Sequence, residues 1–462
     1  MKAGFLSLNT SRRRDIILSG PILSTVMLLS VPTLMMGLVQ SVMPLIDGLF
    51  INNLAGTVAA SSVTYCTPVI AMVAAAAQGL GAASMAMIGQ MNGRGEYSNA
   101  KYIATQVIVS GFLLGCLLAP FLLIIAFPIS SHVNYEISSD VFTYLALNSL
   151  VLPFTFLEAV YNGIKNSSGK PEATFYRMLL LLLLKFVFNF LFIDIISLGV
   201  VGAALSSLFA NLFISVWMYF ELFLKISDDK LELRGFRFDV DVLRELFHIG
   251  MPSMLTSLMV NLGFFLINNE VEKYGAPTLN GQGIASSITS VCFILPSSFG
   301  AAVTTMVSMN IGAGNGKKAL KCCIAGCAVS SVAAAALIAT VVPLSPYLTV
   351  LFTRQPDVLA VANRALHIYT YSVIGFGICA VEISAFIGLG RTVLPLIVGV
   401  MRIWLLRYVF ILLTERFLGV DSVFWGNLFS NYAAAAITTF MLMRVPWVSA
   451  LPLTKKVQKS DR

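Results

Sequence analysis

Two short stretches of this chain are nearly identical: LLKFVF at Leu183–Phe188 and LLRYVF at Leu405–Phe410. A second pair of matches follows them, LFAN at Leu208–Asn211 and LFSN at Leu428–Asn431. A Leu-Gly-Val triplet lies between the two matches in both halves. Such self-similarity in an apolar chain indicates two homologous halves, a construction found in many secondary transporters.

Hydrophobic residues make up 57% of the chain and charged residues only 11%, with a mean hydropathy of +0.85. These values lie far outside the range of soluble globular proteins. Because backbone groups in lipid must be hydrogen-bonded internally, and because the apolar runs lack the alternation of barrel strands, the sequence predicts an all-α polytopic membrane protein. Twelve transmembrane helices are predicted, near residues 21–53, 57–91, 101–129, 139–164, 172–196, 199–224, 243–270, 278–310, 318–352, 356–388, 393–415 and 420–445.

One long polar segment, SDDKLELRGFRFDVD, separates the two halves. It carries charge of both signs and no apolar period, so it is predicted to be a cytoplasmic linker. Each half then forms a six-helix lobe, and the two lobes are expected to be pseudo-symmetric. The predicted divisions are an N-terminal segment at 1–20, an N-lobe at 21–224, a linker at 225–242, a C-lobe at 243–446 and a C-terminal tail at 447–462.

The distribution of the 30 lysines and arginines indicates the orientation in the membrane. If the N-terminus is inside, most of these residues fall in cytoplasmic segments, as the positive-inside rule requires. We therefore expect a multi-pass protein of the cell membrane with both termini in the cytoplasm. The net charge of +8 follows from this topology and does not indicate nucleic-acid binding, since no basic face is interleaved with surface aromatics.

The residue types that most enzymes and metal sites need are few and scattered. The seven cysteines fall within or at the ends of predicted helices, and the three histidines are far apart in sequence. Neither set has the spacing of a metal site or of a nucleophile with its base. We therefore expect no cofactor, no metal site and no enzymatic activity.

Charged residues inside the predicted helices are the candidates for function, because each is costly in a membrane. Asp47 lies in the first predicted helix, three residues after Pro44. Pro44 removes a backbone hydrogen bond and is expected to act as a hinge. Protonation would remove the charge of Asp47, change its partners and let the helix bend there.

A polar stripe is predicted on the fourth helix. Glu158 has Tyr161 and Asn162 three and four residues later, so the three side chains share one helix face. Polar side chains that face lipid would lack hydrogen-bond partners. We therefore assign this stripe, with Gln40, to a substrate cavity in the N-lobe. Together with Asp47 and Lys185, the lobe would hold two carboxylates and one amine, a net charge of −1 that favours a cationic substrate.

The C-lobe repeats this chemistry only in part. The repeat places Arg407 opposite Lys185, and Glu382 within a turn of the position opposite Glu158, so an acid–base pair is expected in both lobes. No acid matches Asp47, because the equivalent stretch reads FFLINNEVE with Glu270 at the helix end. Ion coupling is therefore expected to concentrate in the N-lobe.

Several loose motifs, in their order and spacing, resemble the MATE family of multidrug and toxic compound extrusion transporters. They are Pro32, Pro44 and Asp47 in the first helix, a Gly-rich end of the second helix, LGVVGAA at Leu198–Ala204 and GAGN at Gly312–Asn315. The resemblance covers nearly the whole chain. It implies extrusion of cationic or amphipathic compounds, driven by inward flow of protons or sodium.

The resemblance also assigns roles to particular residues. Asp47 matches the family's first-helix aspartate, and Lys185 and Asn189, which are four apart on one helix face, fall close to it. Asp47, Lys185 and Asn189 are thus the expected ion-coupling group. Many members carry Asn at the position of Lys185. A lysine there would occupy the place of a sodium ion, and this departure favours proton coupling.

The resulting hypothesis is a monomeric, proton-coupled antiporter that exports small organic cations by alternating access. Sodium coupling is the alternative for the ion. A flippase for a lipid-linked saccharide, of the same superfamily, is the alternative for the function, and it would be expected to show a more strongly cationic cavity. A membrane-embedded enzyme lacks the necessary residue cluster, and a non-transporting receptor does not explain charged residues inside both lobes.

Overall fold

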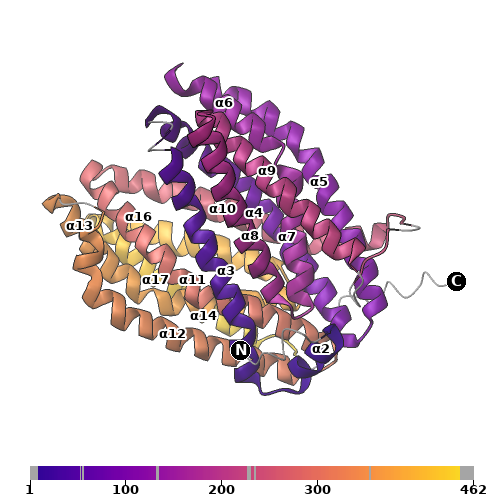
Figure 1. Ribbon diagram of the computed structural model, residues 1–462. Helices are drawn as coiled ribbons and strands as arrows, with labels where there is room; N and C mark the ends of the chain where they lie inside the picture. Colours follow the sequence, from indigo (N-terminus) through magenta and orange to yellow (C-terminus); the bar gives the residue numbers. More distant parts are fainter. Residues whose placement is uncertain are drawn as a thin grey trace. The chain divides into compact units, whose positions relative to one another are not determined.

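A computed structural model describes residues 9–51, 54, 57–131, 135–225, 230–233, 236–352 and 355–447. A few side chains within these ranges lie outside the described part, and that of Pro44, the expected hinge, is one of them. The described chain is helical, and every predicted span coincides with one helix or with consecutive helical segments. The all-α multi-pass class is therefore confirmed (Figure 1).

In the described part of the first half, seven long or medium helices follow a short N-terminal one, and two of them continue as π-helical segments. These elements are α2 (Thr10–Ser19), α3 (Ile22–Phe50), α4 (Thr57–Arg94), α5 (Tyr97–Ser131), α6 (Tyr135–Ser149), α7 (Leu152–Ser167), α8 (Pro171–Asn189), η2 (Phe190–Ile195), α9 (Gly199–Tyr219) and η3 (Phe220–Leu224).

The second half repeats this order of elements. They are α10 (Val240–Glu272), α11 (Ala276–Gly312), α12 (Gly316–Val350), α13 (Pro356–Tyr371), α14 (Val373–Gly388), α15 (Val393–Val400), η4 (Met401–Tyr408), α16 (Val409–Leu418) and α17 (Asp421–Met443). Here α15, η4 and α16 follow one another without a loop, so together they form one predicted span with a π-helical segment in its middle.

Among the described residues, 8 helices are long and apolar enough to cross a membrane, or up to 10 if each of two bent pairs is one span. The bent pairs are α6 with α7, at 48°, and α13 with α14, at 45°. They occupy corresponding places in the two halves, as the sequence repeat predicts. The two remaining predicted spans coincide with α10 and α17.

The chain divides into two compact units. Among the described residues, unit 1 is built mainly from Met35–Met254, with residues 9–14, whereas unit 2 joins Asp15–Leu34 to the residues that follow Met254. The sequence placed the division in the polar segment 225–242, but α3 and α10 each contribute to both units. Polarity marks where the chain leaves the membrane, whereas packing decides which unit a helix segment belongs to.

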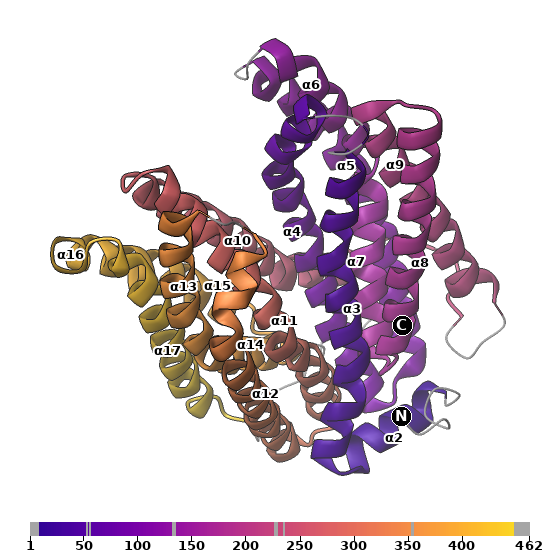
Figure 2. The ribbon, with the colours of Figure 1, turned by 60° about the vertical axis from the view of Figure 1, so that its left-hand side comes forward.

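In unit 1, α7, α8 and α9 run side by side, and α4 packs against α7 (Figure 2). The contact between α4 and α7 depends on glycine. A Cβ atom at Gly163 would lie 2.6 Å from the carbonyl oxygen of Gly81, and one at Gly81 would lie 2.7 Å from that of Ala159. Small residues let membrane helices approach closely, and this approach positions the polar face of α7.

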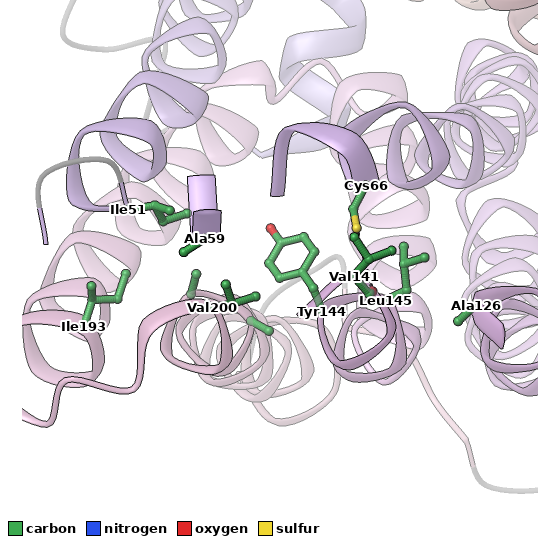
Figure 3. Close-up of a cluster of buried hydrophobic side chains, with 11 residues drawn as sticks. Ile51, Ala59, Cys66, Ala126, Val141, Tyr144, Leu145, Ile193 and Val200 are labelled. Carbon is green, nitrogen blue, oxygen red and sulfur yellow. Dashed lines mark hydrogen bonds between the residues drawn. The ribbon is translucent and has the colours of Figure 1, made fainter. Parts of the chain in front are cut away.

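A buried cluster in unit 1 lies between the ends of α3 and α4, α6 and the start of α9. It includes Ile51, Val141, Leu145 and Val200, and Tyr144 lies among them (Figure 3). These branched side chains fill space that is closed to solvent. The cluster therefore fixes α6, which carries Tyr144 and Asn148 into the cavity described below.

In unit 2, α11 packs against α12, α13 and α14. As in unit 1, glycine permits a close contact between two helices: a Cβ atom at Gly388 of α14 would lie 2.9 Å from the carbonyl oxygen of Thr304 of α11. A second buried cluster includes Ile267, Tyr369, Ile403 and Phe424. It includes Ile403 of η4, the segment in which Arg402 and Arg407 lie.

Candidate functional site

Unit 1 contains a cavity of about 540 Å³ formed by α3, α4, α6, α7, α8 and α9. Its apolar lining includes Met36, Met43 and Met178. The polar lining is extensive and comes from all six helices. It comprises Gln40, Asp47, Thr67, Gln78, Tyr144, Asn148, Thr155, Glu158, Asn162, Arg177, Lys185, Ser207 and Asn211. A mixed wall of this kind suits an amphipathic organic molecule.

Asp47 is held by two side chains of α8. The Lys185 Nζ forms an ion pair with Asp47 Oδ2, and the Asn189 Nδ2 donates a hydrogen bond of 2.9 Å to Asp47 Oδ1. Both come from one face of α8 because they are four residues apart. The structure thus brings together the three residues expected to couple an ion. About a quarter of the Asp47 side chain (27%) is exposed, compared with 10% for Lys185.

A hydroxyl on α9 orients this group. Ser206 Oγ donates to Asn189 Oδ1, which leaves the amide nitrogen of Asn189 directed at Asp47. Asn189 is only 1% exposed and Ser206 is fully buried, so water does not compete for these contacts. Both carboxylate oxygens of Asp47 therefore have a fixed donor. Ser206 was not identified from the sequence, in which a serine on a small-residue helix carries no distinctive signal.

A second ion pair lies on the same cavity wall. Arg177 Nη1 is 2.6 Å from Glu158 Oε2, and Arg177 Nε donates a hydrogen bond of 3.2 Å to Asn162 Oδ1. Glu158 Oε1 is buried and has no hydrogen-bond partner among the described residues. Glu158, Asn162 and Gln40 all line the cavity, as the sequence predicts.

Arg177 is the principal residue that the sequence analysis missed. In the sequence it lies near the start of the predicted span 172–196, close to a polar turn, yet it is 2% exposed and lines the cavity. Its place about two turns before Lys185 on the same helix was the available signal. The predicted net charge of −1 is therefore wrong: the cavity carries two carboxylates and two basic groups, which balance.

Tyr161 does not line the cavity and corrects a second prediction. Its side chain is fully buried, and its hydroxyl donates to Glu221, which also pairs with Lys165 at 2.7 Å. Successive helical residues are about 100° apart, so Tyr161 lies about 60° to one side of Glu158 and Asn162 about 40° to the other. That difference sends Tyr161 toward α9 and leaves Asn162 on the cavity wall.

The acid–base pair expected in the second half is not formed among the described residues of unit 2. Glu382 Oε1 accepts a hydrogen bond of 2.6 Å from Thr439 Oγ1, on α17. The Arg407 guanidinium instead lies 5.6 Å from the ring centroid of Phe264 and 5.9 Å from that of Tyr369. Glu382 has a neighbouring hydroxyl donor, and the helix that corresponds to α3 offers Arg407 no aspartate.

Glu270 lies at the end of α10 and forms a separate group. It pairs with Lys273 and accepts a hydrogen bond of 3.2 Å from the Tyr408 hydroxyl. Lys273 lies beyond the helix end, and its hydrogen bond to Glu270 raises the pKa of its ammonium. Because the Lys273 side chain is 56% exposed, this group is in contact with solvent.

In the described part of the chain, no three His, Cys, Asp or Glu side chains lie close enough to hold a metal ion. The charged side chains that line the cavity are those of the Asp47–Lys185 and Glu158–Arg177 ion pairs.

Comparison with known proteins gives a consistent assignment. A family model described as MatE matches residues 32–191 and 252–413, which is more than half of the chain. The probable multidrug resistance protein YoeA of Bacillus subtilis is 24% identical over 81% of this chain and 83% of its own length. The multidrug export protein MepA of Staphylococcus aureus is 23% identical over 92% of this chain and 94% of its own length.

Solved structures show the same fold. The outward-facing conformation of a multidrug resistance MATE family transporter of the MOP superfamily has a TM-score of 0.87, with 22% identity over 93% of this chain and 97% of that one. A MOP superfamily transporter from Pyrococcus furiosus, described as having a binding pocket of reverse polarity, has a TM-score of 0.88, with 22% identity over 95% and 98%. The chain therefore belongs to the MatE family of membrane transporters.

Proposed function

We propose that this chain is a secondary antiporter that exports amphipathic organic compounds, driven by proton influx through Asp47. The observation that carries the proposal is a carboxylate on a cavity wall with a fixed ammonium and a fixed amide. Intramembrane charges that line a cavity are typical of ion and substrate pathways. The multidrug resistance and export functions in the names of the relatives support the same function.

The coupling would follow from the Asp47–Lys185 pair. A proton on Asp47 removes the negative charge and leaves the Lys185 ammonium, which is 10% exposed, without its counter-ion. A buried charge without a partner is strongly unfavourable. When Asp47 is protonated, any conformation that gives Lys185 a new partner is therefore stabilised. Binding of the proton and the change of conformation are thus coupled.

The position of Lys185 supports a proton rather than sodium as the coupling ion. Its Nζ occupies the place beside Asp47 Oδ2 in which a metal cation would bind. Asn189 fills the neighbouring position with a donor, whereas a sodium ion needs acceptor oxygens. Sodium coupling would require Lys185 to leave before the ion arrived.

Organic cations are the substrate class that we propose for this cavity. A protonated amine can replace the Lys185 ammonium beside Asp47, while its apolar part packs on Met36, Met43 and Met178, whose side chains adapt to different shapes. Because the positive and negative charges of the cavity balance, the cavity has no net electrostatic attraction for a cation. Binding therefore depends on the replacement of the Lys185 ammonium by the amine of the substrate. A balanced wall also differs from the cation-rich cavity expected of a flippase.

The protein is proposed to act as a monomer with both termini in the cytoplasm. All residues of the cavity come from unit 1 of a single chain, so the site requires no second copy. The excess of Lys and Arg in the segments assigned to the cytoplasm supports the orientation.

The test is transport of a fluorescent organic cation in everted vesicles, under a proton gradient or a sodium gradient applied separately. We expect proton-driven transport in the wild type and its loss in Asp47→Asn. The matched control is Asp194→Asn, the same change at an exposed position in η2. Sodium-driven transport that survives Asp47→Asn would contradict the proposal. Movement of a lipid-linked saccharide, without cation export under either gradient, would favour the flippase.

A further inference from the structure

Unit 2 contains a buried arginine that has no counter-ion among the described residues. Arg407 lies in η4 and is 4% exposed. No carboxylate of the described residues forms an ion pair with it, and its Nε has no hydrogen-bond partner among them. An arginine side chain cannot lose its proton in a protein, so the charge persists.

The surroundings of Arg407 attract a cation but do not neutralise it. The ring faces of Phe264 and Tyr369 lie on the guanidinium at 5.6 and 5.9 Å. The Tyr369 hydroxyl is buried, and its polar neighbours are Arg407, Gln282 and Ser286. Aromatic faces supply a favourable electrostatic contact, but a guanidinium has five N–H donors that need acceptors.

The π-helical geometry of η4 places a second positive charge, that of Arg402, near Arg407. A π-helix bonds residue i to residue i+5, which brings Arg402 and Arg407 toward the same side, whereas in an α-helix residues five apart diverge. The charge of Arg402 is close enough to act on Arg407. Arg402 has an amide contact, at 3.5 Å to Asn431 Oδ1, and lies 5.3 Å from the ring centroid of Phe376. No carboxylate of the described residues forms an ion pair with Arg402, and its Nε has no hydrogen-bond partner among them.

We propose that Arg407, with Tyr369 and Arg402, forms a binding site for an anionic oxygen group, most suitably a carboxylate. A guanidinium presents two parallel N–H groups that match the two oxygens of a carboxylate, and the Tyr369 hydroxyl can donate a third hydrogen bond. The group could be part of an amphipathic ligand or a free small anion. The site lies in unit 2 and does not depend on the coupling mechanism proposed for unit 1.

The experiment measures ligand binding by the purified full-length protein in detergent, with thermal unfolding and titration calorimetry as readouts. The probes are 2-naphthoate and the uncharged 2-naphthamide, which have the same ring and nearly the same shape. We expect the wild type to bind the carboxylate about tenfold or more tightly than the amide. Adding chloride distinguishes the sources: competition indicates a site for small anions in general, and none indicates selectivity for carboxylate.

Three variants assign the preference to Arg407. Arg407→Met should abolish it, Arg407→Lys should keep part of it because the charge remains without the planar fork, and the exposed Arg416→Gln should leave it unchanged. Without ligand, Arg407→Met should raise the Tm, since it removes an uncompensated buried charge. Equal binding of the two probes by the wild type, or a carboxylate preference that persists in Arg407→Met, would overturn the proposal. The wild-type comparison and Arg407→Lys decide the question even if Arg407→Met does not fold.

Discussion

The Lys185 ammonium on α8 forms an ion pair with the Asp47 carboxylate on α3, on the wall of a cavity that lies within unit 1. The pair is buried on its lysine side and partly exposed on its aspartate side. A substrate or a proton can therefore reach the carboxylate, while the lysine depends on it for neutralisation.

Removing one partner of this pair should destabilise the protein more than removing both. Lys185→Met leaves Asp47 without its counter-ion, and Asp47→Asn leaves the buried ammonium alone. We expect each single change to cost about 1–3 kcal/mol, less than for a fully buried pair because Asp47 is partly exposed. The double variant should cost less than either single change, and therefore less than their sum. Thermal unfolding in detergent measures all three.

The control for this series is Lys273→Gln, which breaks the Lys273–Glu270 pair. The Lys273 side chain is 56% exposed, so its loss should change the Tm little. Strictly additive effects of the Asp47 and Lys185 changes would show that the two side chains do not interact in the folded protein.

Ser206→Ala should alter the pH dependence of transport through Asn189. The change removes the donor to Asn189 Oδ1, so the amide is free to turn its oxygen toward Asp47. Loss of a buried hydrogen bond costs about 1–2 kcal/mol. Asp47 would lose one of its two fixed donors, and we expect the pH at which the transport rate is half of its maximum to change.

Ser215→Ala is the matched control for Ser206→Ala. Ser215 is buried on the same helix, α9, and its hydroxyl has no hydrogen-bond partner among the described residues. Its removal should leave the pH profile in place. A Ser206→Ala profile identical to that of the wild type would mean that Asn189 does not need this orientation.

The sequence identified the Asp47 group and missed Arg177, the partner of Glu158, because the same criterion was applied to both. Intramembrane position was the criterion, and Asp47 and Lys185 both lie inside predicted spans, at 21–53 and 172–196. Arg177 follows a polar turn closely, so proximity to the turn outweighed its position within α8. Tyr161 shows the limit of spacing arguments. Residues three and four apart share a helix face, but the side chain points to the partner that tertiary packing provides, in this case Glu221.

The twelve helical segments were predictable because apolar length is a property of each segment alone. The division into units was not, since it depends on which segments pack together. The boundaries inside α3 and α10 leave no polar signal, because both sides of each boundary are apolar. The charge of Arg407 was likewise visible in the sequence, while the lack of a carboxylate beside it required the structure.

Arg177→Gln should shift the selectivity of the cavity toward cations. It removes one of the two basic groups that balance the carboxylates, and Glu158 becomes an uncompensated acid on the wall. We expect binding of a quaternary ammonium dye to strengthen relative to an uncharged analogue of the same size, by about threefold to tenfold. Binding of both dyes by the purified protein gives the ratio. The exposed Arg391→Gln is the control, and an unchanged ratio in Arg177→Gln would show that the Glu158 charge does not reach the ligand.

Gly163→Ala should separate α4 from α7 and weaken the cavity wall. The added Cβ would lie 2.6 Å from the carbonyl oxygen of Gly81 and 2.9 Å from the Cβ of Ser84, and neither atom belongs to a flexible side-chain end. Overpacking of this kind costs about 1–3 kcal/mol, more than the helix propensity that alanine gains over glycine. Because Glu158 and Asn162 lie on α7 within about one turn of Gly163, transport of the organic cation should fall together with the Tm.

The same substitution at Gly283 distinguishes the steric clash of the added Cβ from the gain in helix propensity. A Cβ there meets nothing within 4 Å, and Gly283 lies inside α11, so Gly283→Ala should leave the Tm unchanged or raise it slightly. Thermal unfolding of the two alanine variants side by side is the measurement. If both variants unfold at the same temperature, the contact between α4 and α7 is loose enough to accept a methyl group. The polar face of α7 would then be positioned by the Glu158–Arg177 ion pair and not by the close approach of the two backbones.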